Sequence, residues 1–538
     1  MEEIVRGICG QDGCRERRYH IENGIWFCRQ GHQQEGRQVV ADDDDFGTQG
    51  RTVRQKRVAS EKVSKVYSGS KAYQLFLEAY QLILWKQCYA LIHEKGLPQE
   101  LEAIVKDLWT LRLHKLYERS DENYLSDDKT TQVFSSQTEL STAVDEEEQR
   151  YHRKKLSDSP KIIDSLGLCY LGILLLRIPV SIGYIQRWIL RDEVPFLRAI
   201  RFVPDDMKAR LPSIYHVALE TKVLPTGDQF HRAVSDLVML YNQDFGVSFP
   251  PINSSLLLFS YIKQLALPLE VFPAVRHLQS LIGYTFSFSD SIVGRFHRIY
   301  LPEVQLISLV VIVTKLLYPL DDVKRYPYSW KDPAAQAMNW DTWVRTQTEF
   351  EEKGRRGERL RKGEAISVSE SDAFRMAPQQ LDDYMDWYEK MWIDKQISNS
   401  FADMFPTDRI DGSNINDQDD DEENAISEKL RVVLSNLKIR KAVAKDPASP
   451  EFFRPGDRYK RYRSENELHG KAKALYQAAA KIAGTSLRTL VLAVYMTERK
   501  FQDSTPREPR RSMFRKTSES EDEDEDTDIG ETTADFER

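Results

Sequence analysis

The chain has little cysteine and no long apolar run. Only five of its 538 residues are cysteines, which excludes the dense disulfide framework of a small secreted protein and favours a reducing compartment. The most apolar stretch, 306–317, contains Lys315 and is shorter than the about 20 residues that a membrane-spanning helix needs. The N-terminus carries Glu2 and Glu3 and lacks the apolar segment of a signal peptide. We therefore expect a soluble, intracellular protein with no membrane partner.

Recognisable catalytic motifs are lacking as well. His93-Glu94 begins like the zinc-protease motif H-E-x-x-H, but Leu97 stands where the second histidine is needed. The chain has neither a G-x-x-x-x-G-K-[ST] phosphate loop nor a G-x-S-x-G nucleophile turn. Its acidic pairs lie in low-complexity tracts, where solvated carboxylates are typical. We expect a protein that is not an enzyme; a zinc-dependent enzyme with an N-terminal binding module is the alternative.

Three of the five cysteines stand within the first 28 residues, and a histidine follows them. Cys9, Cys14, Cys28 and His32 have the spacing C-x4-C-x13-C-x3-H, which supplies two short-spaced pairs of zinc ligands. Four protein ligands leave no position for water, so the sequence predicts one structural zinc rather than a catalytic one. His20 is the alternative fourth ligand, ranked lower because it lies inside the expected hairpin.

The residues between the two ligand pairs predict a β-hairpin. Segments 18–22 and 25–27 flank Asn23-Gly24, a dipeptide that favours a two-residue hairpin turn. Pair, hairpin and pair together predict a zinc ribbon over residues 1–40. A segment this short cannot fold on apolar burial alone, so it needs the metal. The alternative is that the cysteines are free thiols in a disordered N-terminus.

The formal net charge of −8 is unfavourable for nucleic-acid binding, but the basic residues are concentrated in two segments. The first is an extended basic arm, residues 41–70, and the second is 454–463, where aromatic residues alternate with cations. Both segments predict contacts with nucleic-acid phosphates, through Arg51, Arg54, Lys56, Arg57, Lys62 and Lys65 in the arm and Arg458, Lys460, Arg461 and Arg463 in the second segment. Two alternatives stay open: 54–57 as a nuclear-import signal, and 454–463 as a cover for a neighbouring domain or partner subunit.

Apolar periodicity predicts a mainly α protein beyond the arm. Two successive sets of about five helices each place their most apolar member third, at 161–176 and at 306–317, which suggests two tandem cyclin-like bundles. Cys88 and Cys169 lie in apolar helical stretches and are expected to be core residues. The expected division is a first bundle at 71–205 with a disordered insertion at 120–158, a second bundle at 228–395, an acidic linker at 396–427, a C-terminal helical domain at 428–502 and a disordered acidic tail at 503–538.

The ribbon text CGQDGCRERRYHIENGIWFCRQGHQQEG, followed by a basic arm and two cyclin-like repeats, resembles the layout of general transcription factor IIB. It is more similar still to the RNA polymerase I version of that factor, the zinc-ribbon subunit of fungal core factor, which corresponds to the B subunit of the animal TATA-binding-protein-associated selectivity factor. The stretch 454–484 is the second specific match.

The resemblance implies a general initiation factor for RNA polymerase I, located in the nucleus and nucleolus. The implied partners are the polymerase, the other core-factor subunits, TATA-binding protein and the ribosomal DNA promoter. It also implies that Cys9, Cys14, Cys28 and His32 hold zinc, that the ribbon docks on the polymerase, that the arm approaches the active-site cleft, and that the cyclin folds contact promoter DNA. A cyclin-like kinase regulator is a further alternative, although the basic arm argues against it.

Overall fold

The structure is a computed structural model in which the chain divides into two compact units, residues 1–63 and 64–538. It describes residues 4–5, 9, 14–15, 17–22, 25–38, 66–127, 159–288, 300–355, 359–360, 363–392, 417–444 and 453–504. The six arm cations at 51–65, the insertion from 128 onward, and the acidic tail from 505 onward lie outside the described residues.

The first unit is a small antiparallel sheet. Its four strands are hydrogen-bonded in chain order: β1 (Ile4–Val5), β2 (Arg18–Glu22), β3 (Ile25–Cys28) and β4 (Gln33–Gln38). Glu22 pairs directly with Ile25, so two residues connect β2 to β3, as the Asn-Gly signal predicts. The buried side chains described in this unit are Cys9, Tyr19 and Cys28.

The first helical bundle is built around α4 (Ile162–Leu175), whose sequence is apolar on nearly every side. Such a helix must be covered all round, and α1 (Gly69–His93), α2 (Glu100–Asp127) and α8 (Gly227–Phe245) cover it. Buried Cys88 and Cys169 confirm the expectation that these thiols are core residues.

Two helices of this bundle differ from their sequence-based prediction. Helix α2 continues to Asp127, so the first residues of the expected 120–158 insertion are helical, because extending a formed helix costs little. The apolar spacing of 194–201 predicts a short helix, but the structure has the 3-10 turn η1 (Ala199–Phe202) there. Pro195 disfavours a continuous helix there, and Arg198 has a positive φ of 47°. Helices α5 (Ile182–Leu190), α6 (Asp205–Arg210) and α7 (Ser213–Leu219) complete this region.

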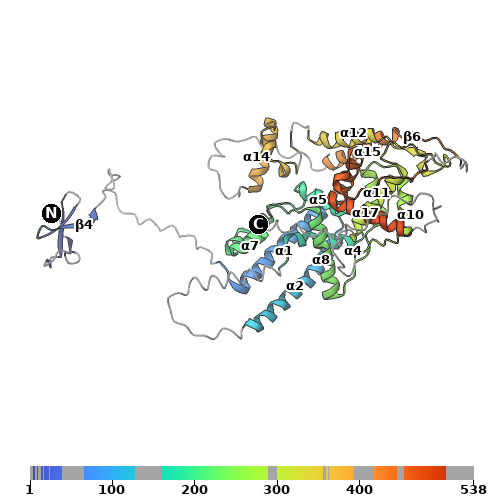
Figure 1. Cartoon of the computed structure of the whole chain (residues 1–538). Coiled ribbons are helices and arrows are strands. Elements are labelled where there is room, and N and C mark those ends of the chain that lie inside the picture. Colours follow the sequence, from blue (N-terminus) through green and yellow to red (C-terminus); the bar gives the residue numbers. More distant parts are fainter. Residues whose placement is uncertain are drawn as a thin grey trace, which may run out of the picture. The chain divides into compact units, whose positions relative to one another are not determined.

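The second bundle surrounds α11 (Pro302–Leu317), which is buried along most of its length. The surrounding helices are α9 (Ser254–Gln264), α10 (Val271–Ile282), α16 (Gly470–Ala483) and α17 (Leu487–Ser504); α10, α11 and α17 lie together in Figure 1. The helices expected to form a separate C-terminal domain therefore complete the second bundle instead. The physical reason is that α9 and α10 leave one side of the apolar α11 uncovered.

Helix α8 also packs differently from its place in the expected second domain, 228–395. It lies against α4 of the first bundle, and the buried hydroxyl of Tyr241 donates to the carbonyl of Leu108 at 2.7 Å. Its N-terminal turn touches the second bundle, where buried His231 is 3.1 Å from the carbonyl oxygen of Ala483. This helix thus belongs to the first bundle by packing and contacts both.

A long excursion separates α11 from α16. Its elements are η3 (Pro333–Ala335), β5 (Gln336–Ala337), α12 (Trp340–Arg355), η4 (Ala365–Ser367), α13 (Glu370–Ala373), α14 (Pro378–Trp392), α15 (Asp417–Ser435), β6 (Lys438–Ile439) and η5 (Glu465–Glu467). Part of the expected acidic linker is the start of α15, which packs on α12 and α9. Acidic residues at a helix N-terminus are favoured by the helix dipole, and buried Lys429 ties the helix to the carbonyl of Gln264 at 2.8 Å.

The two bundles meet at a polar junction. The buried carboxyl group of Glu303, in the first turn of α11, accepts hydrogen bonds from the hydroxyl of Tyr170 at 2.6 Å and from the backbone N–H of Ile182 at 3.1 Å. Asp228 of α8 accepts from the backbone and hydroxyl of Ser486 at 3.0 and 2.6 Å and from Thr489 at 2.9 Å. Each bundle therefore supplies an acid that caps a helix of the other.

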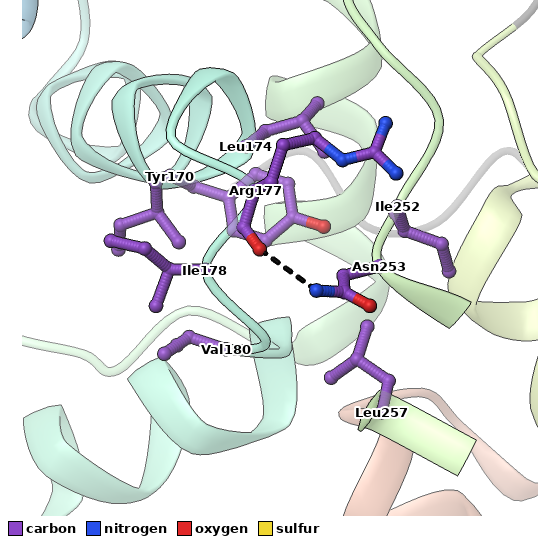
Figure 2. Close-up of a pocket in the computed structure, with 9 residues that line it drawn as sticks. Tyr170, Leu174, Arg177, Ile178, Val180, Ile252, Asn253 and Leu257 are labelled. Carbon is purple, nitrogen blue, oxygen red and sulfur yellow. Dashed lines mark hydrogen bonds between the residues drawn. The ribbon is translucent and has the colours of Figure 1, made fainter. Parts of the chain in front are cut away.

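A third polar contact at the junction lies beside a very small cavity. Figure 2 shows the side-chain amide of Asn253 reaching the backbone oxygen of Arg177, at 3.0 Å. The cavity at this contact is about 10 Å³, room for about one water molecule. Among the described helices, none is long and apolar enough to cross a membrane.

Candidate functional site

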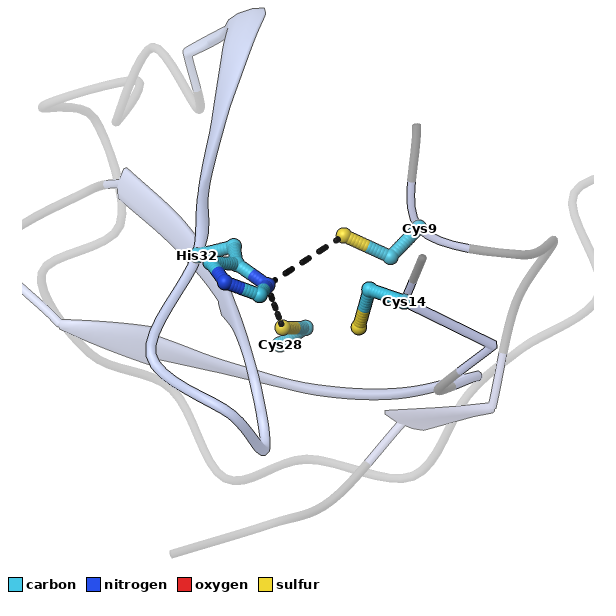
Figure 3. A group of neighbouring side chains, drawn as sticks. All are labelled: Cys9, Cys14, Cys28 and His32. Atoms are coloured by element: carbon cyan, nitrogen blue, oxygen red, sulfur yellow. Dashed lines mark hydrogen bonds between the residues drawn. The ribbon is translucent and has the colours of Figure 1, made fainter. Parts of the chain in front are cut away.

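The four predicted metal ligands come together in the first unit. Cys28 ends β3, His32 follows one turn later just before β4, and Cys9 and Cys14 approach from the preceding chain (Figure 3). Their ligand atoms all lie within 4.8 Å of one another. Sheet pairing explains the placement, because Cys28 lies opposite buried Tyr19 and its side chain is fixed on the inner side of the hairpin.

The spacing of these atoms fits a tetrahedral zinc ion. Zinc bound to sulfur and imidazole nitrogen at usual lengths places neighbouring ligand atoms about 3.5–3.8 Å apart. Nδ1 of His32 lies 3.6 Å from Sγ of Cys28 and 4.0 Å from Sγ of Cys9. Three sulfurs and one nitrogen are the donor set of a closed structural site, with no position left for substrate or water.

The environment of Cys28 favours its thiolate. Burial by itself would raise the pKa of this thiol, but hydrogen bonds with the backbone of His32 and Gln30 and with the neighbouring cysteines lower the pKa overall. The thiolate is the form that binds a metal, so the hairpin prepares this ligand for zinc. His20, the alternative ligand, instead stacks on Phe27 with ring centroids 6.2 Å apart. The geometry favours His32 as the fourth ligand.

The second predicted site, 454–463, forms part of what we call the basic strap, residues 453–463, on the surface of the second bundle. Buried Arg325 holds its first half by donating to the carbonyls of Asp457 and Arg458 at 2.9 and 3.3 Å. Arg454 donates to the carbonyl of Val443 at 2.8 Å. The strap is thus fastened to two earlier segments of the same excursion between α11 and α16, at Arg325 and at Val443.

The strap turns its tyrosines inward and its cations outward. Tyr462 is buried and Tyr459 half-buried, so these rings are turned toward the protein rather than toward solvent, where bases could stack on them. They cover the second bundle, which the other interpretation anticipated. The four predicted cations are exposed, and no described acidic side chain forms an ion pair with them: Arg458, Lys460, Arg461 and Arg463.

Beneath the strap lies an ion pair that the sequence did not reveal. Nζ of Lys315 in α11 is 2.6 Å from Oε1 of Glu498 in α17, and both side chains are almost fully buried. Burial lowers the pKa of Lys315 and raises the pKa of Glu498, while their mutual attraction opposes both shifts. A lysine inside the apolar stretch 306–317 was the available signal, but its partner lies 183 residues away in the chain.

Models of three domains of one family match this chain in order. The zinc-finger of RNA-polymerase I-specific TFIIB, Rrn7, matches residues 3–36, the Rrn7/TAF1B N-terminal cyclin domain matches 80–205, and the Rrn7/TAF1B C-terminal cyclin domain matches 223–392. The last range ends before α16 and α17, which complete the second bundle.

Curated relatives extend over most of the chain. The RNA polymerase I-specific transcription initiation factor rrn7 of Schizosaccharomyces pombe is 26% identical, with 73% of this chain and 77% of the relative covered. The corresponding factor of Saccharomyces cerevisiae is 22% identical, with 74% and 76% covered. A TATA box-binding protein-associated factor of RNA polymerase I from Rattus norvegicus is 24% identical, with 31% and 29% covered.

A solved structure, the core factor of S. cerevisiae, superposes with a TM-score of 0.46 at 17% identity, covering 82% of this chain and 96% of that chain. This likeness is too distant to support a functional argument. The family models carry the assignment, since they match the ribbon and both cyclin domains in the same order as the structure presents them. The chain belongs to the Rrn7/TAF1B family.

Proposed function

We propose that this protein is a general initiation factor of RNA polymerase I, which binds the core promoter of ribosomal DNA and recruits the polymerase. The observation that carries the proposal is the order of three domains of one family, a zinc ribbon followed by two cyclin domains. The curated relatives are named as initiation factors specific to this polymerase. The protein acts in the nucleus, and we place it in the nucleolus because ribosomal DNA is transcribed there.

The division of labour follows from the chemistry of each part. The ribbon is a small rigid module held by one zinc on Cys9, Cys14, Cys28 and His32, and it docks on the polymerase. The basic arm from 41 to 70 follows it toward the template. The two bundles, fastened to each other at the junction, provide a stable body for promoter DNA, TATA-binding protein and the other core-factor subunits.

Neither alternative function gains support from a specific observation. A catalytic zinc keeps one position for water, whereas the described cluster offers four protein ligands within 4.8 Å. The family matches are to initiation factors rather than to enzymes or kinase regulators. We therefore propose that the protein has no catalytic activity of its own.

The test is transcription from a ribosomal promoter in an extract depleted of the endogenous factor. Addition of this protein with its partner subunits should restore initiation. Failure to restore any specific transcript, with a related factor succeeding in the same extract, would contradict the proposal.

A variant with Arg54→Glu, Lys56→Glu and Arg57→Glu sharpens the test. Polymerase binding should remain while initiation falls, because the arm acts after docking. Normal initiation by this variant, with import supplied by a separate signal in cells, would reduce the arm to a targeting sequence.

A further inference from the structure

The basic strap has two faces with opposite chemistry. Along 458–463, Tyr459 and Tyr462 lie against the bundle, while the four cations between and beside them are exposed. Arg461 is steadied by a hydrogen bond to the side chain of Gln502 at 2.7 Å, and the guanidinium of Arg463 lies 5.9 Å from the ring of Tyr495. The outward face is therefore an ordered cationic surface rather than a flexible tail.

The inward face closes around one buried charge. Nζ of Lys315 lies 5.1, 5.3 and 5.9 Å from the ring centroids of Tyr462, Tyr459 and Tyr476. It also donates to the hydroxyl of Tyr476 at 3.3 Å and to Glu498 at 2.6 Å. Two tyrosines of the strap and one of α16 thus surround a lysine of α11, and cation–π attraction is strongest where the cation is desolvated.

Net stability does not explain this arrangement well. Removing two charges from water costs about as much as their attraction returns, so a buried ion pair often adds little to stability compared with apolar side chains of the same volume. Oε2 of Glu498 is buried without a hydrogen-bond partner among the described residues, which adds to the cost. What such a pair supplies is a single defined geometry, because it fixes the positions of the two strap tyrosines against the bundle.

We propose that Lys315 and Glu498, with the tyrosine cage, are positioning residues that hold the basic strap so that Arg458, Lys460, Arg461 and Arg463 present an ordered surface to nucleic-acid phosphates. This inference rests on the proposed role in promoter binding. It adds that residues that never touch DNA set the number of phosphate contacts, by fixing where the cations stand. The Arg325 contacts hold one end of the strap and the cage holds the other.

The experiment uses the full chain and measures binding to a fluorescent duplex of the ribosomal core promoter, and to a scrambled duplex, over a series of salt concentrations. The key variant is Tyr459→Leu with Tyr462→Leu, which keeps every charge of the protein. Each phosphate contact contributes about 0.9 to the slope of log affinity against log salt. We expect the slope to become shallower by about one to two contacts, although no cation has been removed.

A second variant guards against simple unfolding. Lys315→Met with Glu498→Gln also leaves the net charge unchanged and replaces the pair by neutral side chains of similar size. It should melt close to the parent protein and show a smaller loss of slope. Amide hydrogen exchange of residues 457–463 should rise in both variants while exchange in α4 stays unchanged. Tyr384→Leu with Tyr388→Leu, on α14, is the matched control and should change neither readout.

The outcomes separate two claims: that the strap cations contact DNA phosphates, and that the buried cage positions them. Substituting glutamine for all four strap cations should remove the same part of the slope. If that variant binds DNA like the parent, the strap does not contact phosphates and both the nucleic-acid role and the positioning role fail. If it loses affinity while both cage variants keep the parental slope despite faster exchange in the strap, the cations act on DNA without the cage and the positioning proposal alone is wrong.

Discussion

The ribbon and the helical unit are ordered by different forces. Among the described residues of the ribbon, the buried apolar set is Cys9, Tyr19 and Cys28, and two of these are metal ligands. The helical unit has a continuous apolar core that runs through both bundles. Burial of that size can stabilise a fold by itself, whereas the ribbon must take its folding free energy from zinc. The same chain thus contains one unit that depends on a metal and one that does not.

The sharpest test of this contrast is Cys28→Ser. Structural zinc contributes about 10–16 kcal/mol of apparent free energy in small zinc-binding peptides, so losing one thiolate should unfold the ribbon. Zinc content should fall from one ion per chain to none, while the thermal unfolding of the helices, followed by circular dichroism, should stay as in the parent. A shift in helix melting would show that the two units stabilise each other.

The choice of histidine can be tested in the same way. His32→Ala should abolish stoichiometric zinc, and His20→Ala should retain it, because the ring of His20 lies against Phe27. Elemental analysis of both variants decides the matter, and the reverse pattern would assign the fourth position to His20.

Within the helical unit, the largest pH effect should come from Glu303. Burial raises the pKa of this carboxyl to about 8, outweighing its hydrogen bonds with Tyr170 and Ile182, which lower it. In the unfolded chain the pKa is about 4.3, so the folded state favours the protonated acid. The stability linked to this group is complete below about pH 4 and is lost as pH rises toward about 8, with a slope of up to about 1.4 kcal/mol per pH unit.

Glu303→Gln should remove that slope, because the amide oxygen still accepts the same hydrogen bonds without carrying a charge. Urea unfolding from pH 5 to 8 is the measurement, and the variant should be more stable than the parent at the upper end. Equal pH dependence in the two proteins would contradict the assignment. A stability difference confined to this pH range would sharpen the contrast between the two units, since the ribbon contributes nothing to the unfolding of the helices.

A smaller effect is expected from Asp228, the other acid of the junction. Burial alone would raise its pKa, but hydrogen bonds from Ser486 and Thr489 lower it overall. Its stabilisation is therefore present above the unfolded pKa of about 4 and is lost as pH falls through the lower folded value. Asp228→Ala should cost about 1–2 kcal/mol, the usual value of a helix cap.

Differential scanning calorimetry at neutral pH is suited to the Asp228→Ala variant. The stability difference from the parent should shrink at low pH, where the parental carboxylate is protonated. Asp236→Ala, an exposed position in the middle of the same helix, is the control and should have less effect.

The smallest response is predicted for the two core cysteines. Burial raises the pKa of Cys88 to about 12 and raises that of Cys169 as well, and both are buried in the first bundle. Neither should react with iodoacetamide at neutral pH while the protein is folded. After zinc is chelated, mass spectrometry should find alkylation at the three ribbon cysteines alone, so the reagent reports on the two units separately.

Local patterns were sufficient for the ribbon and for most helices. The ligand spacing, the Asn-Gly turn and the strands around it are set by residues near one another in the chain, and Glu22 pairs with Ile25 accordingly. The apolar repeats predicted α4 and α11, because a helix without a polar side has to be central. The positions of Cys88 and Cys169 followed from the same argument.

Local patterns could not predict which helices pack against one another. Helices α16 and α17 were expected to form a separate C-terminal domain, since an acidic tract interpreted as a linker precedes them. Packing shows that they cover α11. The acidic tract at 417–423 is typical of a linker by composition, yet tertiary contacts of Lys429 and Val433 make it the beginning of α15.

The sequence by itself determined the metal ligands that meet in the ribbon, the helical class and the two central helices, because these depend on spacing and periodicity over a few turns. Only the tertiary structure decided which side chains of the basic strap face inward, and that Lys315 pairs with Glu498 across 183 residues. The physical reason is that a buried charge is tolerated only where a distant segment brings its counter-charge, and no local pattern records which segment that is.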